Sequence, residues 1–174
     1  MDPRLRAFVD GDEAAFEALF REYQREVYGW IVRLVRDPSA AEELTIETFW
    51  RIHRGRARFD ASRGFGAWAR RVAINVAIDH LARVGRDKAR LAPIEEAGVA
   101  AAPERDGEAR RSILRAFVNL PATLRVTAHL ALVEERPYQE IAELVGVSAA
   151  AVKSRVFRAT RLLRQELAEW RQPR

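Results

Sequence analysis

The fold of this chain is decided by residues 138–158, which read YQEIAELVGVSAAAVKSRVFR. The stretch predicts a helix, a tight turn and a second helix. Gly146 can adopt the positive φ that the turn demands, and Ser148 suits the N-cap of the second helix. Ala142 is small where the two helices must cross closely, and Val152 is apolar where the second helix packs back. The stretch is therefore expected to form a helix-turn-helix.

The second helix of this motif has a basic outer surface. Its apolar residues recur at helical spacing and are expected to face inward: Val152, Val156, Ala159 and Leu163. The outer surface then carries Lys153, Ser154, Arg155, Arg158 and Arg161. We expect Lys153, Ser154 and Arg158 to contact base edges in DNA, because a bidentate Arg or Lys discriminates guanine by about 1–3 kcal/mol. Arg155 and Arg161 are expected to contact phosphates.

Helical periodicity continues towards the N-terminus. Apolar and aromatic residues recur at three- and four-residue steps over residues 12–35, which predicts an amphipathic helix that ends at Asp37-Pro38. Ser39-Ala-Ala-Glu42 has the form of a capping box and predicts a second helix that begins there. The inward face of this second helix is expected to hold Leu44, Thr48, Phe49 and Ile52. Ile46 is then a β-branched residue on the exposed face.

A basic loop and a buried helix are expected to follow. Residues 54–66 interrupt the helical pattern with three glycines and four arginines around two phenylalanines. The helix after this loop has apolar residues on more than one side and is expected to form the centre of a first bundle, with Trp68 as a core anchor. No segment of the chain has the alternating pattern of a strand, so the expected fold class is all-α.

Two domains are expected, because helical periodicity fades over residues 85–107. Pro93 and Pro103 lie in this stretch, and so long a structureless segment suits a linker better than the interior of a compact domain. Pro121 and Pro137 each suit the first turn of a new helix. The expected organisation is a helical bundle at 1–84, a flexible linker at 85–107 and a second bundle with the helix-turn-helix at 108–174.

Charge is distributed unevenly along the 174 residues, which carry a formal net charge of +5. Residues 1–50 hold six basic and eleven acidic residues, whereas residues 51–90 hold eleven basic and three acidic residues. Residues 121–174 are again basic, with nine basic and six acidic residues. Two separate basic zones suggest an anionic partner that is touched at two places, and nucleic acid is the usual one. Two solvated helix faces are the alternative.

The composition excludes several classes of function. The chain has no Cys, and His53, His80 and His129 stand far apart, so neither a metal nor another cofactor is expected. The sequence has no glycine-rich phosphate loop, nucleophile elbow or Cys/His pair, so an enzyme is not expected. No uncharged run exceeds nine residues, and residues 1–13 lack the apolar core of a secretory signal. We therefore expect a cytoplasmic protein without membrane insertion.

Three motifs, in this order, resemble those of the bacterial extracytoplasmic-function (ECF) sigma factors, the small class that carries only sigma regions 2 and 4. Residues 41–49 (AEELTIETF) resemble the segment that docks on the clamp helices of the largest RNA polymerase subunit. Three short stretches resemble the family's promoter −10 segment: FGAW at 65–68, VAIN at 72–75 and IDHL at 78–81. Leu120-Pro121 and the helix-turn-helix resemble the part that binds the −35 element.

The resemblance implies a sigma factor that binds core RNA polymerase and directs promoter-specific transcription initiation. Promoter DNA is then a partner, and an anti-sigma factor is a further partner expected from the family. Polymerase contacts are implied at Glu42, Glu43, Leu44, Ile46, Glu47 and Phe49. Contacts to the −35 element are implied at Ser148, Lys153, Ser154, Arg155, Arg158 and Arg161.

The basic segment within residues 51–90 agrees with a role at the −10 element. A basic loop with two phenylalanines can hold one DNA strand through its phosphates while an extruded base is bound in a pocket. We expect the residues near that strand to be Arg58, Arg63, Arg70, Arg71 and Asn75. Asn75 and Asp79 lie one helical turn apart, and a purely local hydrogen-bonding role is the alternative for both.

The sequence departs from the family pattern at a few positions. Family members commonly carry Gln at the position of Ile46 and Thr at the position of Ala151. Ile46 can still bury apolar area at a protein interface, whereas Ala151 lacks one hydroxyl donor near the DNA phosphates. Ala82 stands where the family has Arg, and Arg83 follows it, so a phosphate contact at that end is expected to shift by one residue.

The main alternative function is a stand-alone transcriptional regulator. Such a protein uses the same helix-turn-helix but binds duplex DNA unaided, usually as a symmetric dimer. A plain helical hairpin or a helical adaptor would account for the core. Neither explains why Ala142, Gly146 and Val152 coincide with a basic outer surface, and this coincidence favours DNA binding.

Overall fold

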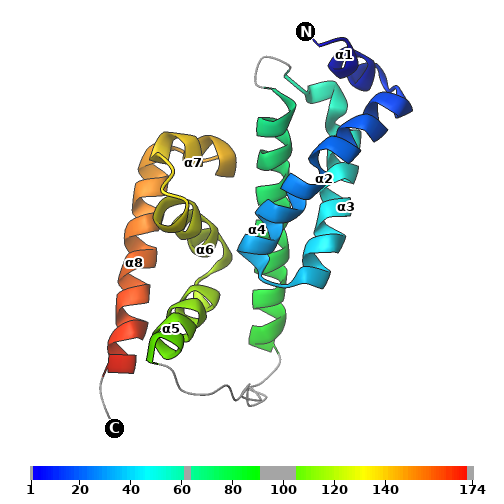
Figure 1. Cartoon of the computed structure of the whole chain (residues 1–174). Coiled ribbons are helices and arrows are strands. Elements are labelled where there is room, and N and C mark those ends of the chain that lie inside the picture. The colour runs from blue at the N-terminus through cyan, green and yellow to red at the C-terminus, as the bar shows by residue number, and fades with distance from the viewer. Residues whose placement is uncertain (1, 61–63, 91–104, 172–174) are drawn as a thin grey trace. The chain divides into compact units, whose positions relative to one another are not determined.

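A computed structural model of the chain describes the backbone of residues 2–60, 64–90 and 105–171. Within these ranges the regular secondary structure is helical and no strand occurs, so the all-α prediction is confirmed (Figure 1). The chain forms two compact units, the first made mainly by Met1–His80 and the second mainly by the residues that follow. Buried apolar side chains occur in both units.

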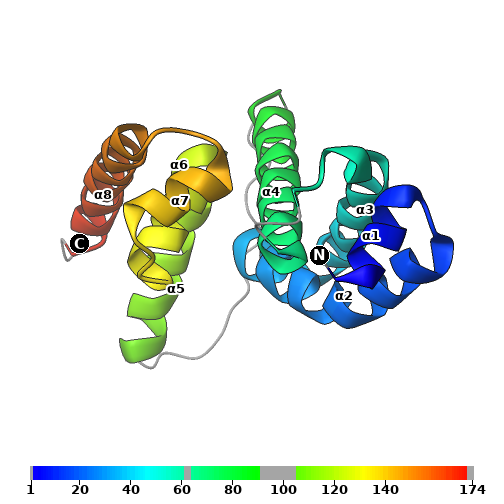
Figure 2. The same ribbon diagram turned by 90° about the horizontal axis from the view of Figure 1, so that it is seen from above.

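The first unit contains α1 (Pro3–Asp10), α2 (Glu13–Val35), α3 (Pro38–Gly55), the short 3-10 helix η1 (Arg56–Arg58) and most of α4 (Phe65–Arg90). The long helices α2, α3 and α4 lie side by side, as both ribbon views show (Figure 1, Figure 2). The core between them holds Leu19, Val27, Ile31, Ile52, Ile74 and Val76. The predicted inward face of α3 is confirmed, because its four residues are all buried.

The start of α3 differs from the predicted capping box. Asp37 Oδ1 accepts a hydrogen bond from the amide of Ala40 at 3.1 Å, and Pro38 occupies the first turn. The prediction that Ser39 caps this helix was therefore wrong. Aspartate is as good an N-cap as serine, and proline fits the first helical position, so the helix begins earlier than the Ser-to-Glu spacing indicates.

The basic loop predicted at 54–66 is shorter than expected. α3 extends through Gly55, η1 follows it directly, and α4 begins at Phe65. Residues 61–63 of the predicted loop lie outside the described residues. The arginines at positions 54, 56 and 58 therefore lie on helical backbone, which fixes the positions of their Cα atoms.

The linker predicted at 85–107 is helical at both of its ends. α4 continues to Arg90, and the next helix begins at Arg105. Gly85 is exposed inside α4, where a glycine costs only about 1 kcal/mol relative to alanine, so it does not end the helix. The remainder of the predicted linker, residues 91–104, lies outside the described residues.

Helix α1, which the sequence analysis did not predict, completes the core of the first unit. Phe8 on this helix is fully buried. Its ring centroid lies 5.7 Å from that of Phe65 and 6.3 Å from that of Trp68, at the start of α4. Phe16 on α2 lies on another side of Phe8, 6.1 Å away. α1 therefore holds the beginning of α4 against α2.

The second unit contains α5 (Arg105–Asn119), α6 (Ala122–Ala128), the π-helical turn η3 (His129–Val133), α7 (Tyr138–Val145) and α8 (Ala149–Arg171). Pro121 and Pro137 directly precede α6 and α7, within one residue of the predicted first-turn positions. The core between α5, α6 and α8 holds Ala116, Leu120, Leu124, Ala128, Ala159 and Leu163. The first turns of α8 therefore form the second helix of the helix-turn-helix, and its later turns pack in the core of the unit.

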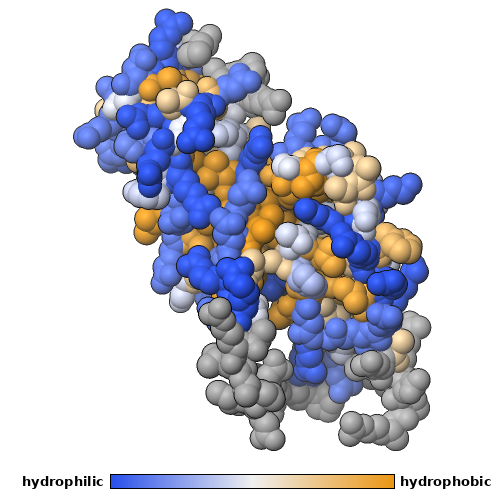
Figure 3. All heavy atoms as spheres, turned by 180° about the vertical axis from the view of Figure 1, so that it is seen from behind, coloured by the Kyte–Doolittle hydropathy of each residue, from blue (hydrophilic) through white to orange (hydrophobic). Residues whose placement is uncertain are grey.

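Both units expose some apolar side chains among charged ones. Figure 3 shows this mixture on one face of the molecule, where orange side chains emerge between blue ones. The large exposed apolar residues include Ile46, Trp50, Val133 and Phe157. Among the helices that the structure describes, none combines the length and the apolar character needed to cross a membrane.

Candidate nucleic-acid and protein interfaces

The helix-turn-helix is built by α7, a turn at Gly146 and the first turns of α8. Gly146 has a φ of 70°, and its amide donates to the carbonyl of Ala142, which also accepts from the amide of Val147 at 3.1 Å. Ser148 Oγ accepts a hydrogen bond from the amide of Ala151 at 3.2 Å, so Ser148 is the N-cap of α8, as predicted. The turn thus fixes the angle at which α8 leaves α7.

α8 presents a basic surface directly after this turn. Its predicted inward residues are all buried. The other side exposes Lys153, Ser154, Arg158 and Arg161, and Arg155 is half-buried. Phe157, which the sequence analysis missed, is 70% exposed one helical turn from both Lys153 and Arg161. Its apolar character within a run of basic residues was the signal that could have identified it.

The outer side of α3 combines carboxylates with apolar side chains. Glu42 and Glu43 are exposed, and Ile46 is 66% exposed, as predicted. Glu47 is half-buried on the same side. Trp50, one turn after Ile46, is 53% exposed and was missed by the sequence analysis. An apolar strip bordered by negative charge therefore runs along this helix.

Leu44 and Phe49 do not belong to this outer surface. Leu44 is 7% exposed and Phe49 is 2% exposed. The ring of Phe49 packs against that of Phe20 on α2, with 4.7 Å between centroids. The expectation that these two side chains contact a partner is therefore corrected: they lie on the inward stripe of α3 and hold the helix in place.

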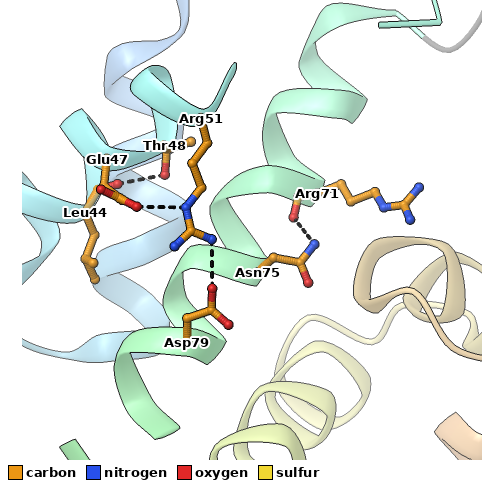
Figure 4. Close-up of polar contacts among 7 residues, drawn as sticks. All are labelled: Leu44, Glu47, Thr48, Arg51, Arg71, Asn75 and Asp79. Atoms are coloured by element: carbon orange, nitrogen blue, oxygen red, sulfur yellow. Dashed lines mark hydrogen bonds and ion pairs between the residues drawn. The ribbon is translucent and has the colours of Figure 1, made fainter. Parts of the chain in front are cut away.

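Arg51 joins α3 to α4. Its Nε donates to Glu47 Oε1 at 2.8 Å, and its Nη1 donates to Asp79 Oδ2 at 2.7 Å (Figure 4). The hydrogen bond to Asp79 raises the pKa of Arg51 above its ordinary value, although partial burial works against it. Asp79 therefore has a partner on another helix, 28 positions away in sequence, and not the local partner within its own helix that the sequence left open.

The arginines of α4 have different surroundings. Arg71 is exposed and its side chain points away from the contact between Arg51 and Asp79 (Figure 4). Asn75 Nδ2 donates to the carbonyl of Arg71 at 2.9 Å, so the amide is oriented by the helix itself. Arg70 instead packs on α2, with its guanidinium 5.3 Å from the ring centroid of Trp30.

A cavity of about 390 Å³ opens where α3 ends and α4 begins. It is lined by Trp50, Arg54 and Gly55 of α3, by Arg58 of η1, and by Trp68 and Val72 of α4. Of these residues, only Arg58 was predicted to contact DNA, and Arg63 lies outside the described residues. Trp68 also packs against the ring of Phe59 at 5.0 Å, so it is both a core anchor, as predicted, and a cavity wall.

Two of the histidines, His53 and His129, lie in different units and pack there separately. The ring of His53 packs against that of Phe16 at 4.9 Å. His129 is buried in the second unit, where its Nε2 lies 3.7 Å from Glu134 Oε1. Over the described ranges, no group of His, Asp and Glu side chains is arranged to hold a metal ion.

Comparison with known proteins matches both units to sigma-factor families. The Sigma-70 region 2 family matches residues 19–87, and the Sigma-70 region 4 family matches residues 110–163. The RNA polymerase sigma factor CarQ of Myxococcus xanthus is 33% identical to the chain, over 95% of this chain and 96% of CarQ. The ECF RNA polymerase sigma factor SigW of Bacillus subtilis is 26% identical, over 95% of this chain and 96% of SigW.

A solved structure has a similar fold. It is the sigma factor RpoE in complex with the anti-sigma factor NepR, from Bartonella quintana. The similarity has a TM-score of 0.58 at 21% sequence identity, and it covers 88% of this chain and 96% of the solved one. At this level of identity the likeness concerns the fold, which is all-helical in both units of the present chain.

Proposed function

Since this chain belongs to the extracytoplasmic-function sigma factors, which direct RNA polymerase to promoters, we propose that its two units divide this task between them. The first unit binds the polymerase and the −10 element, and the second unit binds the −35 element. The chain acts by binding, and the polymerase carries out the chemistry. Its place of action is the cytoplasm, where the polymerase meets the chromosome.

The outer side of α3 is the proposed polymerase surface. Ile46 supplies an exposed apolar contact, and Glu42 and Glu43 supply negative charge beside it. An apolar centre with a charged rim is typical of protein interfaces. Glu47 is held by Arg51 at 2.8 Å, so its carboxylate is oriented before the partner arrives. The carboxylates suit a partner surface that is basic.

The −10 contacts are proposed for η1 and α4. Arg58 and Arg71 are exposed, and arginines that neutralise phosphates release counterions from the DNA. Arg63 lies between them in sequence but outside the described residues, so its contact with DNA is proposed from the sequence alone. Asn75 lies one turn after Arg71 and is proposed to contact the separated strand next to it. Arg70 is proposed to stiffen this surface, because its guanidinium is held against Trp30.

The −35 contacts are proposed for the first turns of α8. Lys153, Ser154 and Arg158 are exposed directly after the capped turn, where a recognition helix meets base edges. Arg155 and Arg161 are proposed to contact phosphates and to set the register of the helix in the groove. Ser148 is occupied by the cap, so its proposed role is to orient α8.

Promoter binding by this division of labour depends on the polymerase. Each unit alone makes few DNA contacts, but attachment of both to one enzyme makes the second contact effectively intramolecular. A protein that covers either surface would therefore silence the factor. We include an anti-sigma factor among the partners on this ground, and the RpoE structure of similar fold, solved with the anti-sigma factor NepR, supports it.

One observation carries the division of labour most directly: a capped helix-turn-helix in the second unit presents four exposed polar and basic residues on one side of α8. The test is transcription with bacterial core polymerase and the full chain, with transcript starts mapped across a genome. We expect starts to share a −10 and a −35 element. In Lys153→Ala and Arg158→Ala proteins the preference at the −35 element should relax, and an unchanged preference would refute base readout by α8.

A further inference from the structure

The outer side of α3 carries an exposed stripe in which residues recur every four positions and so share one face of the helix. The stripe consists of Glu42, Ile46 and Trp50. Two large apolar side chains therefore lie next to a carboxylate, and Glu43 adds a second exposed carboxylate beside it. An exposed apolar patch with a polar border is typical of a surface that binds another protein.

A stripe of the same spacing and of opposite charge runs along α8. It consists of Lys153, Phe157 and Arg161, and Arg164 continues it. A hollow of about 430 Å³ lies beside Phe157 and is lined by Phe157, Thr160, Arg161, Arg164, Gln165 and Ala168. Among the side chains that the structure describes, neither the carboxylates of the α3 stripe nor the cations of the α8 stripe form ion pairs. Both stripes therefore have charge and apolar surface to offer to a partner.

The two stripes are complementary when the helices run antiparallel with Ile46 opposite Phe157. Because both stripes advance by four residues, Glu42 then lies opposite Arg161. Apolar side chains meet in the middle, and a carboxylate meets a guanidinium at one end. Opposite charges across a contact fix its register and disfavour other arrangements.

A parallel arrangement of the same helices is less favourable. It places Arg54, which lies one turn past Trp50, near Arg161 and Arg164, where like charges repel. In the antiparallel arrangement Arg54 lies opposite Ala149 instead. The charge pattern therefore selects one direction for the contact.

The contact requires a second molecule, because the described residues of the chain leave both stripes uncovered. Ile46 is 66% exposed and Phe157 is 70% exposed. A second copy of the chain supplies both stripes at once, so α3 of each copy can contact α8 of the other around a two-fold axis. The contact is then made twice, and the second one forms within a pair that is already joined.

We propose that the free chain forms a two-fold dimer in which α3 of each copy packs antiparallel against α8 of the other. The dimer masks the side of α3 that we assign to the polymerase and the side of α8 that we assign to the −35 element. The masking rests on the proposed function. The pairing rests only on the charge and apolar pattern of the two helices.

The pairing is tested by sedimentation velocity of the full chain without polymerase, over a series of dilutions. The wild-type dimer should dissociate to monomer on dilution. Glu42→Arg and Arg161→Glu should each weaken dimerisation by at least about tenfold, because each places like charges at both contacts. Arg25→Glu is the control: this arginine is exposed on α2, and its reversal should leave dimerisation unchanged. Circular dichroism melting curves check that each variant keeps the fold.

Mixing the two variants identifies the second copy as the partner. In a pair made from one Glu42→Arg chain and one Arg161→Glu chain, one contact has both charges reversed and the other has the native charges. The equimolar mixture should therefore form the dimer that neither variant forms alone. Docking of α8 on α3 of the same chain would not respond to mixing. That result, a monomeric wild type at every concentration, or a dimer that both single reversals leave intact, would overturn the inference.

The masking is tested by energy transfer between two batches of the wild-type chain, labelled at the amino terminus with donor and acceptor fluorophores. Core polymerase should abolish the transfer, because it competes for α3. Transfer that persists while the chain is bound to the polymerase would overturn the masking. Transcription by wild-type holoenzyme tests the proposed function separately: a monomeric chain that still directs transcription overturns only the pairing, and a dimer whose holoenzyme transcribes no promoter overturns only the proposed function.

Discussion

Arg51 on α3 and Asp79 on α4 form an ion pair with 2.7 Å between Nη1 and Oδ2. The same guanidinium holds Glu47 at 2.8 Å, on the side of α3 that we assign to the polymerase. Asp79 lies one turn after Asn75, on the helix that we assign to the −10 strand. Arg51 therefore connects the two proposed binding surfaces of the first unit, and it also borders the cavity between them.

This ion pair is expected to stabilise the first unit only modestly. The side chains are 37% and 56% exposed, so solvent screens the interaction, and we expect a coupling energy of about 0.2–1 kcal/mol. The measurement is a double-mutant cycle of Arg51→Ala and Asp79→Ala by urea unfolding. The exposed pair Arg21 and Glu17 on α2 serves as the control, with an expected coupling of no more than about 0.5 kcal/mol. A coupling of zero between Arg51 and Asp79 would contradict the contact.

Two glycines are expected to respond in opposite directions to alanine. Gly146 has a φ of 70°, where an L-residue costs about 1–2 kcal/mol, so Gly146→Ala should lower the urea midpoint. Gly85 is exposed inside α4 with no atom near an added Cβ, so Gly85→Ala should raise the midpoint by the equivalent of about 0.5–1 kcal/mol. Equal effects of the two changes would show that the turn does not require the positive φ.

Ile46 is expected to contribute to polymerase binding through its apolar surface. It is 66% exposed, so Ile46→Arg should leave the unfolding curve within about 0.5 kcal/mol of wild type. The same change places a buried charge at the proposed interface and should weaken association with core polymerase at least tenfold, as measured by fluorescence anisotropy. Ile46→Gln, which introduces the residue common in the family, should retain binding. Polymerase binding by Ile46→Arg as tight as that of the wild type would show that the outer side of α3 is not part of the interface.

Substitutions in α8 are expected to fall into two groups, according to how they change the dependence of promoter binding on salt concentration and on the −35 sequence. Arg158→Ala should cost holoenzyme about 1–3 kcal/mol on the preferred promoter and relax selection at one −35 base pair. Arg161→Ala should weaken all promoters alike and reduce the slope of log K against log salt by about 1. Binding to a panel of −35 variants at several salt concentrations measures both. Identical profiles for the two variants would contradict the assignment of bases to one and phosphates to the other.

Much of the fold could be predicted because long periodic helices depend on local sequence. The stripe of α2 and the inward faces of α3 and α8 were identified correctly from spacing alone. The end of α4 was not, because an exposed Gly85 resembles a helix stop but costs too little to be one. α1 was missed although Asp2, Pro3 and Gly11 mark its ends, since a helix of eight residues carries a weak periodic signal.

The candidate sites were predictable only where they lie on one helix. Lys153, Arg158 and Arg161 share one side of α8, and their exposure follows from its period. Leu44 was assigned to an interface by resemblance to a family segment, yet the period of α3 places it in the core. The pair Arg51 and Asp79 lies 28 positions apart in sequence, and the cavity draws on three elements. Such contacts depend on tertiary packing, which the local pattern does not specify.

The most direct test of the account is promoter binding by the full chain with and without core RNA polymerase, measured by gel shift at physiological salt. The account predicts that the chain associates with the core enzyme and that tight, promoter-specific binding occurs only in that complex. Tight binding of the isolated chain to promoter duplex, or failure to associate with the core enzyme, would contradict it.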